Sequence, residues 1–200
     1  AFASRKLTSL QKENKVSLWD NCGVLQLLQN DKDINYANRL LSKNNYTSEI
    51  IEYVTKTQAQ NIAKTQINKS ALLHKLCGKA HPKIVCAALL DHPNITTVFE
   101  KSIASIFRDQ TQDRWVINSK DGDSYSDTTL VIATANDSIS FSQTRHLPVK
   151  PIKGQISVSP LNDNNTQLKT VLCADGYAAY SHGIGLCFGA SLELGKNNQE

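Results

Sequence analysis

The first half of the chain has apolar positions that are spaced for short amphipathic helices. Residues 1–20 are mostly polar and favour a helix. A second helical face is marked by apolar residues three or four positions apart, namely Ile34, Ala37, Leu40 and Leu41. Residues 23–28 predict a short strand, because a glycine opens a brief apolar run there. This half is therefore expected to be helical with one short strand.

Three residues mark the starts of further helices. Ser48 and Ser70 each stand just before apolar residues, and a serine at that position can cap the first turn of a helix. Pro82 fits a first turn because its fixed φ is already helical. The pattern predicts a buried face on this last helix, made of Ile84, Val85, Ala88 and Leu89.

After His92 the pattern changes to that of strands. Apolar and polar residues alternate over residues 95–99 and again over 103–107, and Trp115 and Ile117 share one face of a third strand. Helices come first and strands follow, so the predicted fold class is α+β, or mixed α/β.

A continuous apolar run at residues 130–133 predicts a strand that is buried on both faces. Asp121-Gly122, shortly before it, favours a hairpin turn. Later strands are expected at residues 155–159, 170–173 and 184–190.

The composition is that of an ordinary globular chain of 200 residues with a formal net charge of +4. The basic residues are dispersed, so charge alone does not indicate a nucleic-acid binder. No apolar run approaches the roughly 18 residues of a membrane span. The first residues lack the apolar stretch of a secretory signal, so a cytoplasmic protein without membrane contact is expected. Methionine is absent, so we expect that Ala1 is not the native start.

The cysteines do not indicate disulfides or a metal site. They number five, an odd count, and no C-x-x-C occurs. Most have apolar neighbours in the sequence and are expected to be small buried side chains. His74-x-x-Cys77 is half a metal site at best, because zinc needs further ligands at suitable spacing.

The usual catalytic motifs are missing, including the Gly-x-Gly-x-x-Gly dinucleotide turn. Three local features remain. The run at 130–136 ends in small residues, which suit either close approach to a cofactor or a tight turn. The prolines at 148 and 151 force an extended crossing segment, which is either a plain crossover or part of a site. Residues 173–180, followed by Gly189-Ala190-Ser191, predict a hairpin whose small residues border tyrosines. Tyr177 or Tyr180 lines a pocket there, or is a core or rim tyrosine with its hydroxyl satisfied.

Taken in order, these segments resemble the FAD-dependent oxidoreductases of the D-amino-acid oxidase and glycine oxidase class. Within that class they are most similar to the oxidoreductase domain of bifunctional tRNA wobble-uridine modification enzymes. The segments that carry the resemblance are Asn21–Leu27, Ala133-Thr134-Ala135, Ile139–Thr144, Leu147-Pro148-Val149, Gly154–Ser157, Val171–Tyr177 and Gly189-Ala190-Ser191.

The chain departs from the family pattern in four places, one of which is a shorter segment at Gly78–His81, before the helix expected to begin at Pro82. In the family, the signature that follows the strand expected here at residues 130–133 usually finishes in glycine, where this chain has Ala135. The N-terminal glycine-rich turn that holds the FAD pyrophosphate is not present, and neither is the C-terminal stretch that closes over the flavin.

The resemblance implies a division of the chain. Residues 1–92 would be the helical part of a substrate domain, with one short strand. Residues 93–150 would be the strand-rich part of an FAD-binding domain, and residues 151–200 would return to the substrate domain as strands.

The resemblance also implies site residues around a noncovalent FAD. Ile103 would read the adenine edge through its backbone. The remaining cofactor-binding positions would be Ala133, Thr134, Ala135, Gly154 and Gln155. On the substrate side it implies Tyr177 and Ser191. It assigns no catalytic acid or base and no metal.

The activity implied is oxidative removal of the carboxymethyl group from carboxymethylaminomethyl-uridine in tRNA. Hydride loss from the carbon next to the amine and hydrolysis of the imine would give aminomethyl-uridine and glyoxylate. A fused methyltransferase domain, if attached, would then use S-adenosylmethionine. The alternative is a noncatalytic, truncated relative that binds RNA or a protein partner, which the missing phosphate-binding turn favours.

Overall fold

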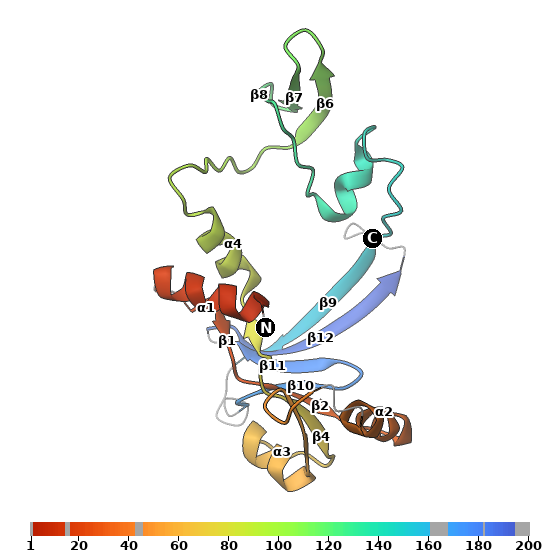
Figure 1. Cartoon of the computed structure of the whole chain (residues 1–200). Helices are drawn as coiled ribbons and strands as arrows, with labels where there is room; N and C mark the ends of the chain where they lie inside the picture. Colours follow the sequence, from red (N-terminus) through yellow and green to blue (C-terminus); the bar gives the residue numbers. More distant parts are fainter. Residues whose placement is uncertain (1, 15–16, 43–45, 161–167, 182, 195–200) are drawn as a thin grey trace. The chain divides into compact units, whose positions relative to one another are not determined.

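The computed structural model describes residues 2–14, 17–42, 46–160, 168–181 and 183–194. The chain divides into two compact units (Figure 1). The first unit comprises Ala1–His92 and Gly154–Ser191, and the second comprises Pro93–Lys153 and Leu192–Glu200. No helix among the described residues is both long and apolar enough to cross a membrane.

The first unit is built on a mixed sheet of seven strands in the order β3-β4-β2-β10-β11-β12-β9. Its strands are β2 (Val24–Leu27), β3 (Ile51–Val54), β4 (Ala71–His74), β9 (Ile152–Ser159), β10 (Val171–Cys173), β11 (Tyr177–Ser181) and β12 (Gly185–Leu194). β10 runs parallel to β2, whereas β2–β4, β3–β4, β10–β11 and β11–β12 are antiparallel pairs. The mixed sheet with its helices confirms the predicted fold class.

Four helices and a short strand pair complete this unit within the described residues. They are α1 (Phe2–Asn14), α2 (Asp31–Ser42), α3 (Lys56–Ala63) and α4 (Pro82–Leu90), with β1 (Trp19–Asp20) paired to β5 (Lys79–Ala80). The helices expected at 34–41 and after Pro82 are confirmed. The buried face expected on α4 is not, since none of its residues is buried and Leu89 and Leu90 are 49% and 41% exposed.

The two faces of the sheet carry separate hydrophobic clusters. Ala59 and Ala63 of α3 pack with Leu25 and Val54 on one face. Ala37 of α2 packs with Leu28, Ile51 and Leu72 on the other. Side chains alternate between faces along a strand, so these clusters fix which residues of the later strands share each face.

The helices expected after Ser48 and Ser70 are wrong, because those segments form β3 and β4. β4 lies between β2 and β3 and bonds to both, so pairing in the sheet outweighs a local capping signal. The first 92 residues therefore contain more than one short strand. The cap that does operate is Thr55, which forms a capping box with Gln58 at the start of α3.

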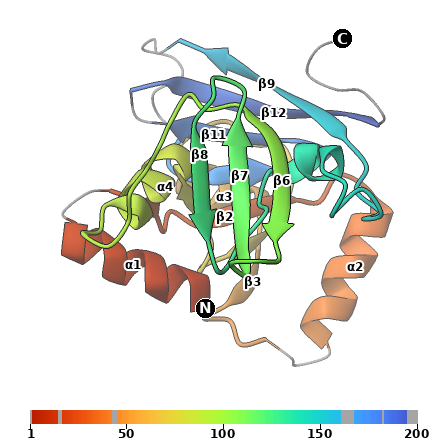
Figure 2. The ribbon, with the colours of Figure 1, turned by 90° about the horizontal axis from the view of Figure 1, so that it is seen from above.

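The second unit contains a three-stranded antiparallel sheet in the order β6-β7-β8, followed by a short 3₁₀ helix, η1 (Ala135–Ser140). Figure 2 shows β7 between β6 and β8. The strands are β6 (Ile103–Asp109), β7 (Arg114–Ser119) and β8 (Ser124–Asp127). The hairpin turn at Asp121-Gly122 is confirmed, and Gly122 has a φ of 98° there.

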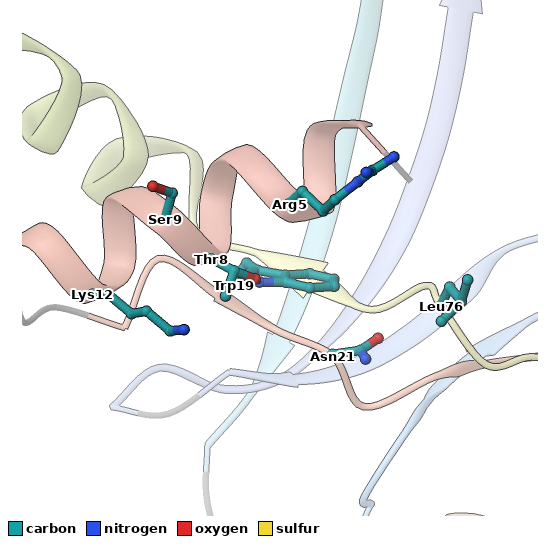
Figure 3. Close-up of a pocket in the computed structure, with 7 residues that line it drawn as sticks. All are labelled: Arg5, Thr8, Ser9, Lys12, Trp19, Asn21 and Leu76. Atoms are coloured by element: carbon teal, nitrogen blue, oxygen red, sulfur yellow. The ribbon is translucent and has the colours of Figure 1, made fainter.

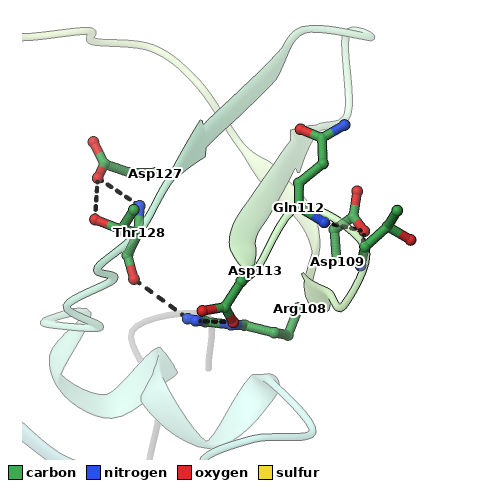
Figure 4. A network of polar contacts seen from close by, with 7 residues as sticks. Arg108, Asp109, Gln112, Asp113, Asp127 and Thr128 are labelled. Carbon is green, nitrogen blue, oxygen red and sulfur yellow. Dashed lines mark hydrogen bonds and ion pairs between the residues drawn. The ribbon is translucent and has the colours of Figure 1, made fainter.

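At one end of this small sheet, Arg108 links the turn between β6 and β7 to the chain that leaves β8 (Figure 4). Its Nε donates to Asp113 Oδ1 at 3.1 Å, and its Nη1 donates to the carbonyl oxygen of Thr128 at 3.3 Å. The guanidinium also lies 5.5 Å from the ring centroid of Trp115. The arginine therefore fixes the chain where it leaves β8.

Two strands expected in this unit are not formed. Residues 95–99 have no regular structure, and Phe99 is 71% exposed. The run Leu130–Ala133 is also irregular, and Val131 is 80% exposed instead of buried. A strand buried on both faces needs neighbouring strands, and the described sheet ends at β8.

Candidate functional site

One face of the seven-stranded sheet carries a continuous row of candidate site residues. Gly189 pairs with Tyr177, Tyr177 with Cys173, and Cys173 with Gln26. Paired residues point to the same side of a sheet, so this row lies on the face of Leu72. Tyr180 lies on the opposite face and packs against the α3 cluster. Of the two tyrosines considered from the sequence, Tyr177 is therefore the one on the face opposite α3, and its side chain is partly exposed.

Gly189 makes room for the ring of Tyr177. A Cβ placed on Gly189 would lie within 3.0 Å of that ring, closer than real Cβ atoms approach. The phenol is thus laid across a glycine of the neighbouring strand, and Tyr177 stays 38% exposed. Gly176, in the turn before it, faces the carbonyl oxygen of Gly189, which a Cβ would approach to 2.6 Å.

A polar pair lies on the same face. The Nε2 atom of His74 is 3.1 Å from Oε1 of Gln26, across β4 and β2. Burial lowers the pKa of His74 below its ordinary value, so its imidazole is neutral near pH 7. The pair therefore offers uncharged donors and acceptors beside the tyrosine row.

The cysteines differ from the sequence expectation. All five are free thiols and none is fully buried; Cys77 and Cys86 are exposed. Burial raises the pKa of Cys173, and the nearby Cys77 raises it further. Burial also raises the pKa of Cys22, which Asp20 reinforces. Among the described residues, no three His, Cys, Asp or Glu side chains are grouped to hold a metal ion.

The structure places Gly154 and Gln155 on β9, both exposed. Gly154 lies beside Ser191 of β12, since a Cβ on Gly154 would be 3.5 Å from the Ser191 carbonyl oxygen. Ser191 and Tyr177 occupy neighbouring strands, and Ser191 shares the face of Gly189 by alternation. The first unit therefore brings Gly154, Tyr177 and Ser191 together around β11, β12 and β9.

Ile103, Ala133, Thr134 and Ala135 lie in the second unit. Ile103 opens β6 at an irregularity in the pairing with β7. Thr134 precedes η1, and its Oγ1 lies 3.2 Å from Ser138 Oγ. The segment after η1 is tied to β6 by Gln143, whose Nε2 donates to the Ile106 carbonyl oxygen at 2.7 Å.

Ala135 has a φ of 50°, in the left-handed region. Only glycine adopts this region without a steric cost, so the family preference for glycine here has a backbone reason. Ala133 to Ala135 are exposed and carry short side chains, which leaves their backbone open to a ligand.

Sequence reasoning missed Gly189 as the seat of the tyrosine ring, and it missed the His74–Gln26 pair. Gly189 belonged to a segment noted for small residues that border tyrosines, but its contact with Tyr177 depends on the register of β11 with β12. The His74–Gln26 pair joins residues that are 48 positions apart, so it depends on the pairing of β2 with β4.

Comparison with known proteins identifies relatives of this whole arrangement. The family model described as FAD dependent oxidoreductase matches residues 2–200. A curated protein of Chromobacterium violaceum, named tRNA 5-methylaminomethyl-2-thiouridine biosynthesis bifunctional protein MnmC, is 30% identical over 205 residues, covering 100% of this chain and 31% of that protein. The protein of the same name from Chromohalobacter salexigens is 31% identical over 194 residues, covering 97% of this chain and 27% of its own length.

Solved structures share the fold. Glycine oxidase from Geobacillus kaustophilus superposes with a TM-score of 0.75 at 17% identity, covering 98% of this chain and 55% of that one. L-proline dehydrogenase from P. horikoshii gives a TM-score of 0.71 at 15% identity, covering 98% and 56%. The chain thus spans about a third of the curated relatives and just over half of these structures.

Proposed function

Since this chain belongs to the family of FAD-dependent oxidoreductases, we propose that it is part of an amine oxidoreductase that acts on the wobble uridine of tRNA. The substrate class rests on the names of the relatives that are about 30% identical. The reaction proposed is removal of the carboxymethyl group of carboxymethylaminomethyl-uridine, which releases glyoxylate and leaves aminomethyl-uridine.

The second unit supports a role in holding FAD. The pairing of β6 with β7 shifts register between Ile103 and Ser105, which leaves Ala104 without a partner on β7, and backbone groups beside Ile103 could bond to an adenine edge. Ala133, Thr134 and Ala135 present small side chains and a left-handed turn, which suit close approach of backbone to a cofactor. The sequence has no Gly-x-Gly-x-x-Gly turn, so the residues present fit the adenosine and flavin ends better than the pyrophosphate.

The first unit supports a role in holding the substrate. Bound FAD would supply the two-electron acceptor for amine oxidation. Tyr177 would present its hydroxyl to the substrate from the face opposite α3, with its ring held against Gly189. Gly154 and Gln155 would lie near the flavin on β9, with their side-chain positions on opposite faces of the strand, and Ser191 would add a polar group beside Gly154. These roles position the reactants, and no group is assigned as a catalytic acid or base.

The single observation that carries this proposal is the family match over residues 2–200. The test uses protein expressed from the natural reading frame, incubated with tRNA that contains carboxymethylaminomethyl-uridine. We expect aminomethyl-uridine in the digested tRNA and an equal amount of glyoxylate. Tyr177→Phe should raise KM, because the hydroxyl is lost while the ring stays. A thermal melt of Tyr177→Phe and Tyr177→Ala would check that both variants remain folded.

The alternative, a noncatalytic RNA- or protein-binding relative, is distinguished by the same test. It predicts tRNA binding without any change in the uridine. Any attached methyltransferase domain, and its S-adenosylmethionine, would be detected separately as methylation of the aminomethyl product. Unchanged tRNA in the presence of excess FAD would contradict the enzyme proposal.

A further inference from the structure

A pocket outside the tyrosine row lies between α1 and the segment that leads from β1 into β2 (Figure 3). Its volume is about 390 Å³, within the range of sites for small ligands. The residues that line it are Arg5, Thr8, Ser9, Lys12, Trp19, Asn21 and Leu76. All of them belong to the first compact unit.

The spacing along α1 explains why one side of the helix faces this pocket. Thr8 and Ser9 lie three and four positions after Arg5, and Lys12 lies four and three positions after them, so the four residues share a single helical face. The two cations are seven residues apart, about 10 Å along the axis. In Figure 3 they lie toward opposite ends of the Trp19 ring.

The indole of Trp19 is fixed in place by the helix. Its Nε1 donates to Thr8 Oγ1 at 3.0 Å. Gln11 Oε1 accepts from the backbone nitrogens of Leu18 and Trp19, at 3.0 and 3.2 Å. Trp19 belongs to neither hydrophobic core cluster of this unit, although it is one of only two tryptophans in the chain. Its ring is thus oriented beside a cavity without serving the core.

The charge of the lining is positive. Among the described residues that line the pocket, two are cationic and none is a carboxylate. The neighbouring Asp20 has a partner elsewhere, since its Oδ2 lies 3.4 Å from Lys79 Nζ. The lining of the pocket therefore has a net positive charge, which favours an anionic ligand.

We propose that this α1–Trp19 pocket binds a nucleotide unit of the tRNA, an assignment that rests on the proposed tRNA substrate. The base stacks on the indole, which is the sequence-tolerant way in which proteins hold single-stranded bases. Arg5 and Lys12 contact the phosphates on either side, which position the strand without reading its sequence. The pocket is thus an anchoring site, separate from the tyrosine row where the uridine reacts.

The test measures binding of a fluorescently labelled tRNA transcript by the protein expressed from its natural reading frame. Arg5→Glu/Lys12→Glu should weaken binding at least about tenfold and lower the slope of log affinity against log salt by about two. Trp19→Ala should weaken it roughly 5- to 150-fold, with Trp19→Phe in between.

The matched control is Lys32→Glu/Lys56→Glu, which makes the same change of charge at the first turns of α2 and α3, away from the pocket. Glutamate is favourable at those positions, so folding is preserved. The control should reduce binding far less than the pocket variant. If both double variants weaken tRNA binding equally, the pocket is not a binding site for tRNA and the effect is a general one of charge.

The outcomes separate this inference from the proposed function. If the unchanged protein binds tRNA and the pocket variants bind equally well, the pocket assignment alone is wrong. If the unchanged protein does not bind tRNA, the tRNA substrate and the pocket both fail.

Fluorescence gives a second, independent readout. The emission that Trp19 contributes, measured as the difference between the unchanged protein and Trp19→Phe, should be quenched by an oligouridylate. Uridine monophosphate should compete weakly with the oligomer, because it offers one phosphate in place of two. Competition as strong as that of the oligomer would instead indicate a site for free nucleotides.

Discussion

At the scale of single residues, the candidate site depends on backbone and burial more than on charge. Ala135 occupies a left-handed conformation that glycine would adopt freely, and His74 is kept neutral by burial. Gly154, Gln155, Tyr177 and Ser191 could be selected from the sequence because each lies in a segment that resembles the family. Ile103 was selected by its position in the strand expected at 103–107. Their roles toward cofactor and substrate stay predictions.

Replacing Ala135 by glycine should stabilise the second unit. A non-glycine residue at a φ of 50° carries a cost of about 1 kcal/mol, which glycine removes. Urea denaturation should show an increase of this size in the free energy of unfolding. Ala133→Gly is the matched control, since Ala133 is not among the positive-φ residues and should lose stability. Equal losses in both variants would contradict the strain at Ala135.

The stability of the first unit should depend on the protonation of His74. Its folded-state pKa lies below the ordinary value of 6.5, so the unfolded chain takes up a proton first as the pH falls. The stability is present above about pH 6.5 and is lost as the pH falls from there toward the folded pKa. In thermal melts from pH 7.5 to 5.5, His74→Gln should lose less stability than the unchanged protein. Identical pH profiles would count against a buried, neutral imidazole.

At the scale of elements, the sequence predicted those whose signals are local. The helices at residues 34–41 and after Pro82, the hairpin at Asp121-Gly122 and the later strands were correct. β3 and β4 were mistaken for helices because a serine can precede either element, and only pairing with β2 decides between them. The run at 130–133 is apolar enough for a central strand but lacks partners in the described sheet.

Thr55 should be the residue that fixes the start of α3. Its side chain accepts from the backbone nitrogen of Gln58 in a capping box. Thr55→Ala should therefore lower the free energy of unfolding by about 1 kcal/mol in chemical denaturation. Thr57→Ala makes the same change inside the helix, where alanine is favourable, and should be neutral or slightly stabilising. A similar loss at both positions would argue against the cap.

The pairing of β11 with β12 should couple Gly189 to the position of Tyr177. Gly189→Ala places a Cβ against a half-exposed ring that can swing away, so activity should fall about tenfold to a hundredfold with little loss of stability. Gly176→Ala meets the backbone of Gly189 instead and should lower the melting temperature more. The two readouts are turnover and thermal unfolding. Full activity in Gly189→Ala would contradict a role for the position of the Tyr177 ring in the proposed site.

At the scale of the whole molecule, the family match extends across both compact units. The chain nevertheless spans 31% of a curated relative and 55% of a glycine oxidase structure. The sequence lacks the turn that would hold the FAD pyrophosphate, so the 200-residue chain by itself is expected to retain little or no flavin.

The protein that contains this 200-residue chain should bind FAD, because the chain belongs to the family of FAD-dependent oxidoreductases. The most direct measurement is the flavin content of protein expressed from the natural reading frame, determined by absorbance before and after denaturation. The account predicts a yellow protein that releases stoichiometric, noncovalent FAD. A colourless protein that gains no bound flavin when FAD is added would contradict it.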